Sequence, residues 1–284
     1  MTQTSVPTVT LNNGVEIPQV GLGVFQVPDD GTQANVEQAL EVGYRHVDTA
    51  AGYDNEEGVG AALRASGLPR EQLFVTTKLR NGDQGYEQAL RAFEDSRRAL
   101  GVDQVDLYLI HWPVPSRDLY VETWRAFEKL LAEGAVRAIG VSNFLPDHLE
   151  RLVAETDVVP AVNQVEVHPT FQQAEVQARC RALGVTVEAY SPLGRGADLG
   201  AAAVVAAATE LGVTPAQVVL RWAVQQGRVV IPKSMSVERQ ATNIDVFSFE
   251  LSPAQTAQLN ALESGVEGRT GADPATASFT QFRH

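Results

Sequence analysis

Short apolar runs alternate with longer amphipathic stretches along most of this 284-residue chain, and this alternation constrains the fold more than any other feature. Apolar runs of strand length lie at residues 20–24, 45–48, 74–78, 105–111, 138–141, 161–165, 186–190 and 229–232. Helical spacing fills the intervals at residues 32–41, 55–63, 84–100, 119–132, 146–154, 174–183 and 214–225. Short apolar strands that are separated each time by a helix pair in parallel and are buried on both faces. About eight of them predict the α/β class and a closed (β/α)8 TIM barrel.

Helix caps and one hairpin support this interpretation. A capping residue followed by proline, with glutamine three residues after the cap, occurs at Thr214 and again at Ser252. Glycines that suit the left-handed conformation of a helix C-cap stand at Gly43, Gly101, Gly134 and Gly184. Residues 8–11 and 15–17 flank the turn sequence NNG at residues 12–14, which predicts a β-hairpin that caps the bottom of the barrel. No linker interrupts the pattern, so residues 1–284 are expected to form a single domain.

Composition bounds the partners and the compartment. With 22 basic and 35 acidic side chains the formal net charge is −13, so the surface repels phosphate backbones and nucleic-acid binding is not expected. The single cysteine, Cys180, can form neither an internal disulfide nor a Cys-based zinc site. Residues 1–15 lack the basic and apolar regions of a signal peptide, and no apolar run approaches the roughly 20 residues of a membrane helix. We therefore expect a soluble, cytoplasmic protein.

Polar residues close successive predicted strands, at the end of the barrel where proteins of this fold carry their chemistry. These residues are Asp48, Lys78, His111, Ser142, Asn143, Gln164, Tyr190, Ser191, Lys233 and Ser234. Taken alone, each residue has a structural explanation. Asp48 could cap a turn, and Lys78 could extend from a strand end to solvent. His111 could be a core histidine whose ring nitrogens are hydrogen-bonded. Capping does not account for a polar group at one exit after another. The set as a whole predicts an active site.

Four residues in this region have a chemical logic together, although Tyr53 alone fits ordinary loop packing. A buried Lys78 beside Asp48 stays charged, and its charge is expected to lower the pKa of the Tyr53 hydroxyl by favouring the phenolate. A free tyrosine, with a pKa of about 10, is a poor acid at neutral pH, so the shift would let Tyr53 release a proton. His111 would hydrogen-bond the same substrate oxygen. The four residues are suited to protonating a carbonyl oxygen.

Specific motifs surround these residues in a characteristic order. They are GYRHVDTA at residues 43–50 with Tyr53, Asn55 and Glu56, TTKL at 76–79, DLYLIHWP at 106–113, GVSNF at 140–144 and IPKS at 231–234. From about residue 9 to residue 274 the sequence resembles the aldo-keto reductase family. The resemblance implies that Asp48, Tyr53, Lys78 and His111 form the catalytic tetrad. The short connection after Trp112 and the sequence EGRTGADP at 267–274 resemble the prokaryotic branch typified by 2,5-diketo-D-gluconate reductases.

The same resemblance implies an NADPH site on the barrel itself. No Rossmann fingerprint is present, because GLGVFQ at residues 21–26 lacks the third glycine and GVG at 58–60 follows polar residues. By resemblance, the carboxamide would be held by Ser142, Asn143 and Gln164, and the nicotinamide ring would stack on Tyr190. The pyrophosphate would lie along Ser191, Leu193 and Gly194. The 2′-phosphate would be bound by Lys233, Ser234 and Arg239, and Asn243 would match the adenine contact. Thr242 departs from the Glu or Gln that the family often has, so weaker adenine contacts are expected, with NADP preferred over NAD.

Lys233 and Arg239 also fit a solvated helix start. Against that reading, two fixed cations on an acidic protein form a local positive site, and arginine can meet a phosphate with two hydrogen bonds. The phosphate-binding interpretation is therefore preferred.

Two other classes of function compete with a reductase. A metal-dependent barrel hydrolase or isomerase could use His46 and Asp48, but no further His, Asp or Glu completes a site and HExxH is absent, so no metal is expected. The GVSNF segment ends in Phe144 where a serine nucleophile elbow needs glycine. A non-catalytic, NADP-binding regulatory barrel is the other alternative, and the intact tetrad argues against it. We therefore favour an NADPH-dependent carbonyl reductase.

The substrate pocket is expected to be aromatic and open. Phe25, Tyr53, His111 and Trp112 would line it, and a short C-terminal substrate loop at about residues 264–284 would bring Phe279 and Phe282 over it. Apart from Lys78 of the implied tetrad, no obvious recurrent cation lies beside the pocket, so broad reduction of small aldehydes, α-dicarbonyls and keto-sugars is expected rather than selection of one sugar acid. The expected partner is a small carbonyl substrate, with no nucleic acid, no membrane and a monomeric chain.

Overall fold

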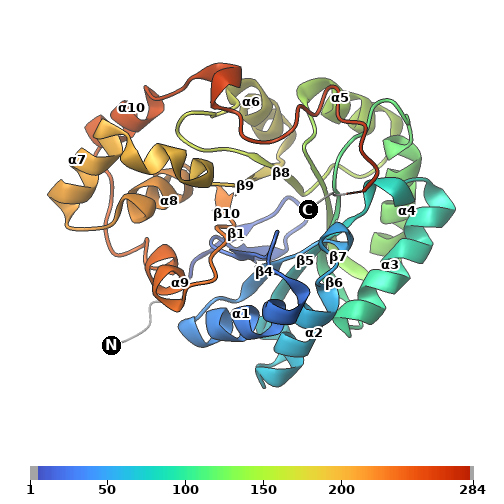
Figure 1. Cartoon of the computed structure of the whole chain (residues 1–284). Helices are drawn as coiled ribbons and strands as arrows, with labels where there is room; N and C mark the ends of the chain where they lie inside the picture. Colours follow the sequence, from blue (N-terminus) through green and yellow to red (C-terminus); the bar gives the residue numbers. More distant parts are fainter. Residues whose placement is uncertain (1–5, 282–284) are drawn as a thin grey trace.

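A ring of parallel strands forms the centre of the protein and helices surround it (Figure 1). The computed structural model describes residues 6–281. The sheet has the order β10-β9-β8-β7-β6-β5-β4-β3. Its strands are β3 Leu22–Gly23, β4 His46–Asp48, β5 Phe74–Leu79, β6 Val105–Ile110, β7 Val136–Ser142, β8 Val162–Glu166, β9 Thr186–Tyr190 and β10 Val229–Val230. Each strand neighbours the next along the chain, as repeated strand–helix units require.

The two edge strands meet and close the barrel. Val20 and Val230 form a parallel bridge, the Gly21 N–H donates to the Val230 carbonyl (2.9 Å) and the Val230 N–H donates to the Gln19 carbonyl (3.0 Å). β3 and β10 are shorter than the sequence pattern predicted; at β10 the following Pro232 has no N–H for a ladder. The predicted (β/α)8 barrel is confirmed.

The two glycines of the GLG sequence lie in tightly packed parts of the barrel. A Cβ added at Gly21 would lie 2.5 Å from Nδ1 of His46 on β4, and one added at Gly23 would lie 2.8 Å from the Ile231 carbonyl oxygen, just after β10. Neither position has room for a side chain.

Ten α-helices lie within the described residues. They are α1 Asp29–Val42, α2 Glu56–Ala65, α3 Tyr86–Leu100, α4 Tyr120–Ala132, α5 Pro146–Glu155, α6 Ala174–Leu183, α7 Ala202–Leu211, α8 Pro215–Gln225, α9 Val237–Ile244 and α10 Pro253–Asn260. Neither α7 nor α9 was predicted from the sequence. α7 is apolar almost throughout, so it shows no helical period, although its alanines favour a helix. α9 is only eight residues long.

The predicted caps are largely confirmed. Thr214 and Ser252 each form a capping box with the glutamine three residues later, and Gly43, Gly101 and Gly184 are left-handed C-caps. Gly134 has a positive φ of 72° but follows the C-cap of α4, which is Glu133.

The N-terminal hairpin fills the bottom of the barrel. β1 (Thr8–Thr10) and β2 (Glu16–Pro18) pair antiparallel, and Asn12 and Asn13 donate to carbonyls at the start of strands β8 and β7. Leu11 and Ile17 are buried in one apolar cluster with strand residues that include Phe74. This seals the barrel at the end opposite the polar strand exits, as predicted.

Between sheet and helices the packing is aromatic and aliphatic. The rings of Tyr108 and Phe127 stack with centroids 4.4 Å apart, and Phe93 meets Tyr108 edge-on. Burying side chains of this size contributes about 1.5–3 kcal/mol each. The helices are thereby fixed against the strands, and the strand exits become rigid positions for polar side chains.

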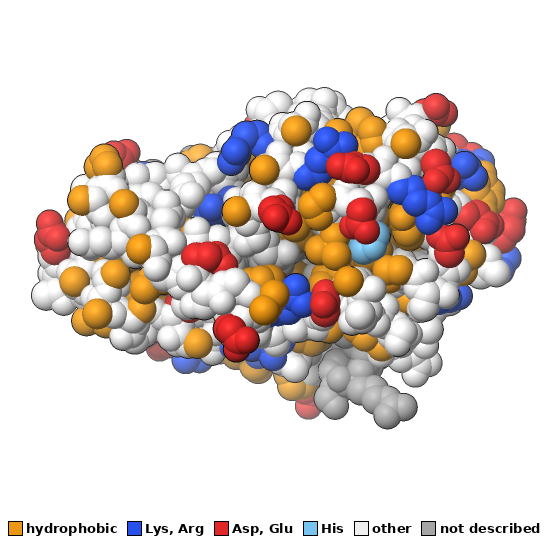
Figure 2. All heavy atoms as spheres, turned by 90° about the horizontal axis from the view of Figure 1, so that it is seen from above, with side chains coloured by type: hydrophobic (Ala, Val, Ile, Leu, Met, Phe, Trp, Pro, Cys, Tyr) orange, Lys and Arg blue, Asp and Glu red, His pale blue; other side chains and the backbone are white. Residues whose placement is uncertain are grey.

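Acidic and basic side chains are interspersed on the face shown in Figure 2, and neither sign gathers there into one patch. Within residues 6–281 no single helix has the length and apolarity to cross a membrane; α7 and α8 meet that test only as a pair, and they are bent by 95° at the break between them.

Candidate active site

Four of the predicted residues converge at the carboxyl ends of β4, β5 and β6. Asp48 ends β4, Lys78 lies near the end of β5, and His111 directly follows β6. Tyr53 reaches them from a short 3-10 helix, η1 (Ala51–Tyr53), which turns back at Asp54 in the left-handed conformation. Parallel register aligns these strand ends, so residues far apart in sequence meet at one edge. The structure brings together all four residues that the sequence predicted.

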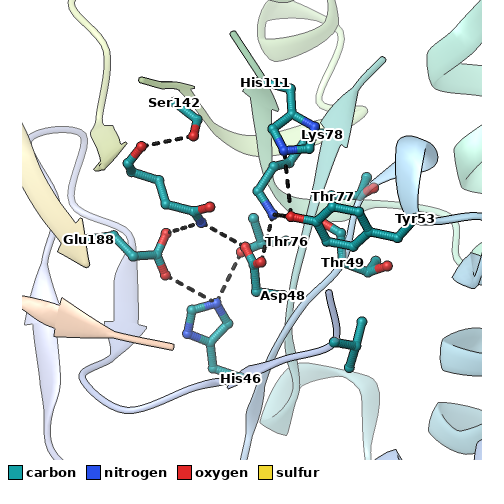
Figure 3. A network of polar contacts seen from close by, with 12 residues as sticks. His46, Asp48, Thr49, Tyr53, Thr76, Thr77, Lys78, His111, Ser142 and Glu188 are labelled. Carbon is teal, nitrogen blue, oxygen red and sulfur yellow. Dashed lines mark hydrogen bonds and ion pairs between the residues drawn. The ribbon is translucent and has the colours of Figure 1, made fainter. Parts of the chain in front are cut away.

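Lys78 is the centre of the arrangement and is fully buried. Its Nζ lies 2.6 Å from Oδ1 of Asp48, 2.9 Å from the Thr49 carbonyl oxygen and 3.3 Å from the Tyr53 hydroxyl (Figure 3). An ammonium has three protons to donate, and three acceptors surround this one. The Lys78 charge is therefore held in place and directed at the tyrosine hydroxyl.

The Tyr53 hydroxyl lies between a cation and an imidazole. It is 3.3 Å from Nζ of Lys78 and 3.5 Å from Nε2 of His111. The Tyr53 ring packs against Phe25 with centroids 5.0 Å apart and meets His111 edge-on at 5.5 Å. Figure 3 shows His111 and Lys78 approaching the hydroxyl from one side of the ring. An oxygen placed beside Tyr53 and His111 could contact both groups.

One prediction about this hydroxyl is wrong. Burial raises the pKa of Tyr53 above its ordinary value of 10, and the charges of Asp48 and Glu188 raise it further. The charge and hydrogen bond of Lys78 lower the Tyr53 pKa but do not outweigh these effects. The lysine charge is visible in the sequence, whereas the degree of burial is not. Tyr53 is therefore protonated at neutral pH and has a proton to donate.

His111 is neutral in this environment. Burial lowers the pKa of His111 well below its usual value, and the neighbouring Lys78 charge lowers it further. Burial acts against the Lys78 charge as well, but Asp48 and Tyr53 outweigh it and raise the Lys78 pKa. The site thus holds one fixed cation, one protonated phenol and one neutral imidazole.

Below this group lies a second buried layer. Its Gln164 was predicted as a site residue, whereas Glu188 was not. Nε2 of Gln164 donates to Oδ2 of Asp48 (2.8 Å) and to Oε2 of Glu188 (2.9 Å). Nε2 of His46 lies 3.1 Å from the Thr76 hydroxyl and 3.7 Å from Oε1 of Glu188. Figure 3 shows His46, Glu188 and Asp48 facing one another across the barrel.

The strand period held a signal for this layer. Glu188 precedes Tyr190 by two residues on β9, and His46 precedes Asp48 by two on β4, so each pair shares a face. The layer is not a metal site: among residues 6–281, no group of three or more His, Cys, Asp or Glu side chains could hold a metal ion.

Glu188 makes the stability of the fold depend on pH. Burial raises the pKa of Glu188 from 4.5 to about 8, with the Asp48 charge adding to the shift. The folded chain therefore binds this proton more tightly than the unfolded chain, and the resulting stability is lost as pH rises through about 8.

We expect Glu188→Gln, which is neutral at every pH, to gain in Tm relative to the wild type between about pH 5 and pH 8.5. Thermal melts across that range test this, with the exposed Glu57→Gln as control; parallel curves for all three proteins would contradict it.

The residues predicted for the carboxamide and nicotinamide adjoin the same group. The Tyr190 hydroxyl donates to Oδ1 of Asn143 (2.8 Å), and Nδ2 of Asn143 donates to the His111 carbonyl oxygen (3.0 Å). The Ser142 hydroxyl donates to the Gln164 carbonyl oxygen (2.8 Å). These four residues and the tetrad form one continuous hydrogen-bonded surface at the top of the barrel.

The loop after β9 (residues 191–200) holds the residues predicted for the pyrophosphate. Ser191 and Gly194 have positive φ angles of 45° and 54°, and the Gly194 N–H donates to the Ser191 carbonyl (2.9 Å). Leu193 is the N-cap of the 3-10 helix η4 (Gly194–Gly200). This tight turn continues directly from Tyr190, so the loop borders the residue predicted to stack on the nicotinamide.

The residues predicted for the 2′-phosphate surround the start of α9. Lys233 and Arg239 are exposed, and neither forms an ion pair with another residue of the described chain. Ser234 is buried next to them and Asn243 is buried at the end of the helix. The hydroxyl of Thr242 donates to the Glu238 carbonyl oxygen (2.7 Å), so it is already used within α9.

Two of the aromatic residues predicted for the substrate, Trp112 and Phe279, contact each other beside His111. Trp112 and Phe279 meet edge-on with centroids 5.1 Å apart, in a small cluster with Val114 and Ala277. Nδ2 of Asn81 donates to the Phe279 carbonyl oxygen (2.9 Å). The C-terminal segment therefore reaches the side of the site formed by Trp112. Phe282 lies outside the described residues.

The chain is similar to known proteins over most of its length. The model of the aldo/keto reductase family matches residues 19–264. An aldo-keto reductase of Mycolicibacterium smegmatis is 52% identical over 274 residues, 96% of this chain and 99% of the relative, and the glyoxal reductase of Bacillus subtilis is 48% identical over 274 residues, 96% and 98%. The crystal structure of a Gox0644 mutant in complex with NADPH superposes with a TM-score of 0.93 at 44% identity, covering 97% of this chain and 100% of the other. The resemblance to 2,5-diketo-D-gluconate reductases stays a prediction.

Proposed function

This chain belongs to the aldo/keto reductase family, and from that premise we propose that it reduces carbonyl groups to alcohols with NADPH, using Tyr53 as the general acid. The observation that carries the proposal is the Tyr53 hydroxyl, placed 3.3 Å from the ammonium of Lys78 and 3.5 Å from Nε2 of His111. The relatives include a glyoxal reductase and a structure solved with NADPH, which supports both the reaction class and the coenzyme.

The donor set fits NADPH. Amide and hydroxyl groups of Ser142, Asn143 and Gln164 lie beside the tetrad, where a carboxamide would find both donors and acceptors. Lys233 and Arg239 stand at the start of α9, whose N-terminal N–H groups favour an anion. When bound, NADPH supplies the hydride that reaches the carbonyl carbon.

The chain itself handles the proton. The substrate oxygen accepts hydrogen bonds from the Tyr53 hydroxyl and from the neutral His111 ring. As the carbon gains hydride, the developing negative charge on the oxygen draws the proton from Tyr53, which leaves a phenolate. The Lys78 ammonium stabilises that phenolate at close range, and Asp48 holds Lys78 in position. These charges are fixed before the reaction starts and need no reorganisation.

The reaction class is tested by following NADPH absorbance with aldehydes, diketones and keto-sugars in metal-free buffer. The reductase proposal expects loss of absorbance in the absence of added metal. A non-catalytic barrel would bind NADPH and leave the absorbance unchanged. A hydrolase or isomerase would consume no NADPH under any of these conditions.

The coenzyme proposal makes a prediction at α9. Replacing Lys233 and Arg239 by alanine together is expected to raise the Kd for NADPH at least about 100-fold, because each charged hydrogen bond to phosphate is worth about 1.5–3 kcal/mol. The Kd for NADH should change by less than about threefold, since NADH lacks the 2′-phosphate. Fluorescence titration measures both constants, with the exposed Arg98→Ala as a control. Equal weakening of both coenzymes would place the 2′-phosphate elsewhere.

We propose that the substrates are small aldehydes and α-dicarbonyls, held between Phe25 and Trp112 with the C-terminal segment over them. A chain that ends before Thr276 loses the contact of Phe279 with Trp112. Its KM for α-dicarbonyls is expected to rise about tenfold, about 1.4 kcal/mol, with the Kd for NADPH unchanged. Steady-state kinetics on a carbonyl panel measure this; unchanged KM values would show that Phe279 does not touch substrate. Turnover of 2,5-diketo-D-gluconate alone would contradict the open aromatic pocket.

A single domain, a monomeric state and a cytoplasmic location remain part of the proposal. One cooperative thermal transition, a monomer mass in light scattering and recovery in the soluble cell fraction are the corresponding expected results.

A further inference from the structure

A second buried charged group lies outside the tetrad. It consists of His168, which follows β8, Glu166 at the end of β8, and Asp198 in η4, and all three are almost fully buried. Nδ1 of His168 lies 2.8 Å from Oδ2 of Asp198, and Nε2 lies 3.2 Å from Oε1 of Glu166. One imidazole therefore stands between two carboxylates.

Each carboxylate holds a different segment of the chain. Oε1 of Glu166 accepts from the N–H (2.7 Å) and hydroxyl of Thr270, and Oε2 accepts from the Gly271 N–H (2.9 Å). Asp198 belongs to the loop after β9. A Cβ added at Gly194 would lie 2.8 Å from Oδ2 of Asp198, so this loop is packed directly on the carboxylate.

The two segments border the coenzyme and substrate residues. Gly194 and its neighbours continue from Tyr190, and a Cβ added at Gly271 would lie 3.3 Å from the Tyr190 hydroxyl. Beyond Gly271 the chain continues to Phe279 against Trp112. In Figure 1 this C-terminal stretch runs from α10 past α6 and α5 and returns toward the middle of the barrel.

We infer that His168 is a positioning residue that fixes the loop after β9 and the C-terminal segment to one another through a single buried imidazolium. The inference rests on the proposed function, because the loop is assigned to the coenzyme and the segment to the substrate. His168 itself touches neither ligand. It sets the relative position of the two walls between which they bind.

The chemistry of the ring explains why the charged form is needed. Burial lowers the pKa of His168, but hydrogen bonds and charges from Asp198 and Glu166 outweigh it and raise the pKa to about 9. The charged ring has two N–H donors, one for each carboxylate, whereas the neutral ring has one. Above that pKa the one remaining ring proton stays on the shorter bond, from Nδ1 to Asp198, and Glu166 with the C-terminal segment loses its hydrogen bond to the ring.

The surroundings of the ring contain few other charges. Thr170 donates from its hydroxyl to Oδ1 of Asp198 (2.7 Å) and lies 3.1 Å from Nδ1 of His168. On the C-terminal segment Arg269 lies over the ring of Phe171 and pairs with Asp273, and Arg195 belongs to the loop after β9. The nearby Tyr190 phenol has its pKa raised by burial, so it stays uncharged.

Separate variants of the two carboxylates distinguish the two attachments. Asp198→Asn is expected to raise the Kd for NADPH about tenfold and to leave the KM for the carbonyl substrate within about twofold. Glu166→Gln is expected to do the reverse, and His168→Gln to raise both constants. In each variant kcat at saturation should stay within about threefold of the wild type, because the tetrad is intact.

The pH dependence of binding distinguishes a positioning role of His168 from a purely structural one, which would not affect it. In the wild type the KM for the carbonyl substrate, measured by steady-state kinetics, is expected to rise as pH passes through about 9. In Glu166→Gln it should be already high and nearly independent of pH. A flat wild-type profile, or carboxylate variants that weaken both constants equally or neither, would overturn the inference.

One further measurement needs no coenzyme and so separates this inference from the proposed function. Trypsin cleavage after Arg269 is expected to be about tenfold faster in Glu166→Gln and His168→Gln than in the wild type, and unchanged in Asp198→Asn. The two carboxylate variants also carry the test if His168→Gln does not fold. Wild-type protein that binds no NADPH overturns the proposed function, while cleavage rates that are equal in all four proteins overturn this inference.

Discussion

Replacing Tyr53 by phenylalanine is expected to reduce the rate of carbonyl reduction between about 100-fold and 10,000-fold. The substitution removes only the hydroxyl, which is the group that Lys78 and His111 approach at 3.3 Å and 3.5 Å. The ring remains, with its packing against Phe25. The proton donor is therefore lost while the shape of the pocket is kept.

Single-turnover measurements with saturating NADPH test this prediction at the chemical step. The Kd for NADPH should stay within about twofold, since the proposed coenzyme contacts lie on other residues. Tyr86→Phe on α3 is a matched control, because it also removes one phenolic hydroxyl and should leave the rate unchanged. A Tyr53→Phe rate above about one tenth of the wild type, which is about 1.4 kcal/mol of barrier, would remove Tyr53 from the role of acid.

The alternation of strands and helices predicted the barrel because it depends only on local periodicity. The bounds of α6 and β9 agree with the sequence pattern to the residue, and both elements have clear ends in the sequence. The positions of Asp48, Lys78 and His111 followed from the same logic, since parallel strands carry their last residues to one end of a barrel. For these residues, the order along the chain is sufficient to place them together.

The rest of the site depends on contacts across the barrel, which the sequence does not show. Gln164 donates to Asp48, which is 116 positions away in the sequence. It also donates to Glu188, and this second hydrogen bond is seen only in the folded structure. The predicted direction of the Tyr53 pKa shift was wrong for a related reason. The shift is the sum of the effects of burial and of several charges, and burial is a property of the fold. His168 likewise reads as one polar residue after a strand until Asp198 and Glu166 are seen on either side.

Replacing Lys78 by methionine is expected to reduce carbonyl reduction at least about 1,000-fold and to destabilise the fold by about 3–5 kcal/mol at neutral pH. Two effects have to be separated here. The phenolate of Tyr53 loses the cation that stabilises it, and the buried Asp48 loses its ion-pair partner at 2.6 Å. The first concerns the reaction, and the second concerns folding.

The double variant Lys78→Met with Asp48→Asn separates them. It removes both charges, so no uncompensated buried carboxylate remains, and the amide oxygen that replaces the carboxylate can still accept the hydrogen bond from Gln164. Chemical denaturation should therefore recover most of the lost stability, whereas single-turnover reduction should stay as slow as in Lys78→Met. If activity returned together with stability, the Lys78 charge would serve the fold alone, and Tyr53 would need no cation to release its proton.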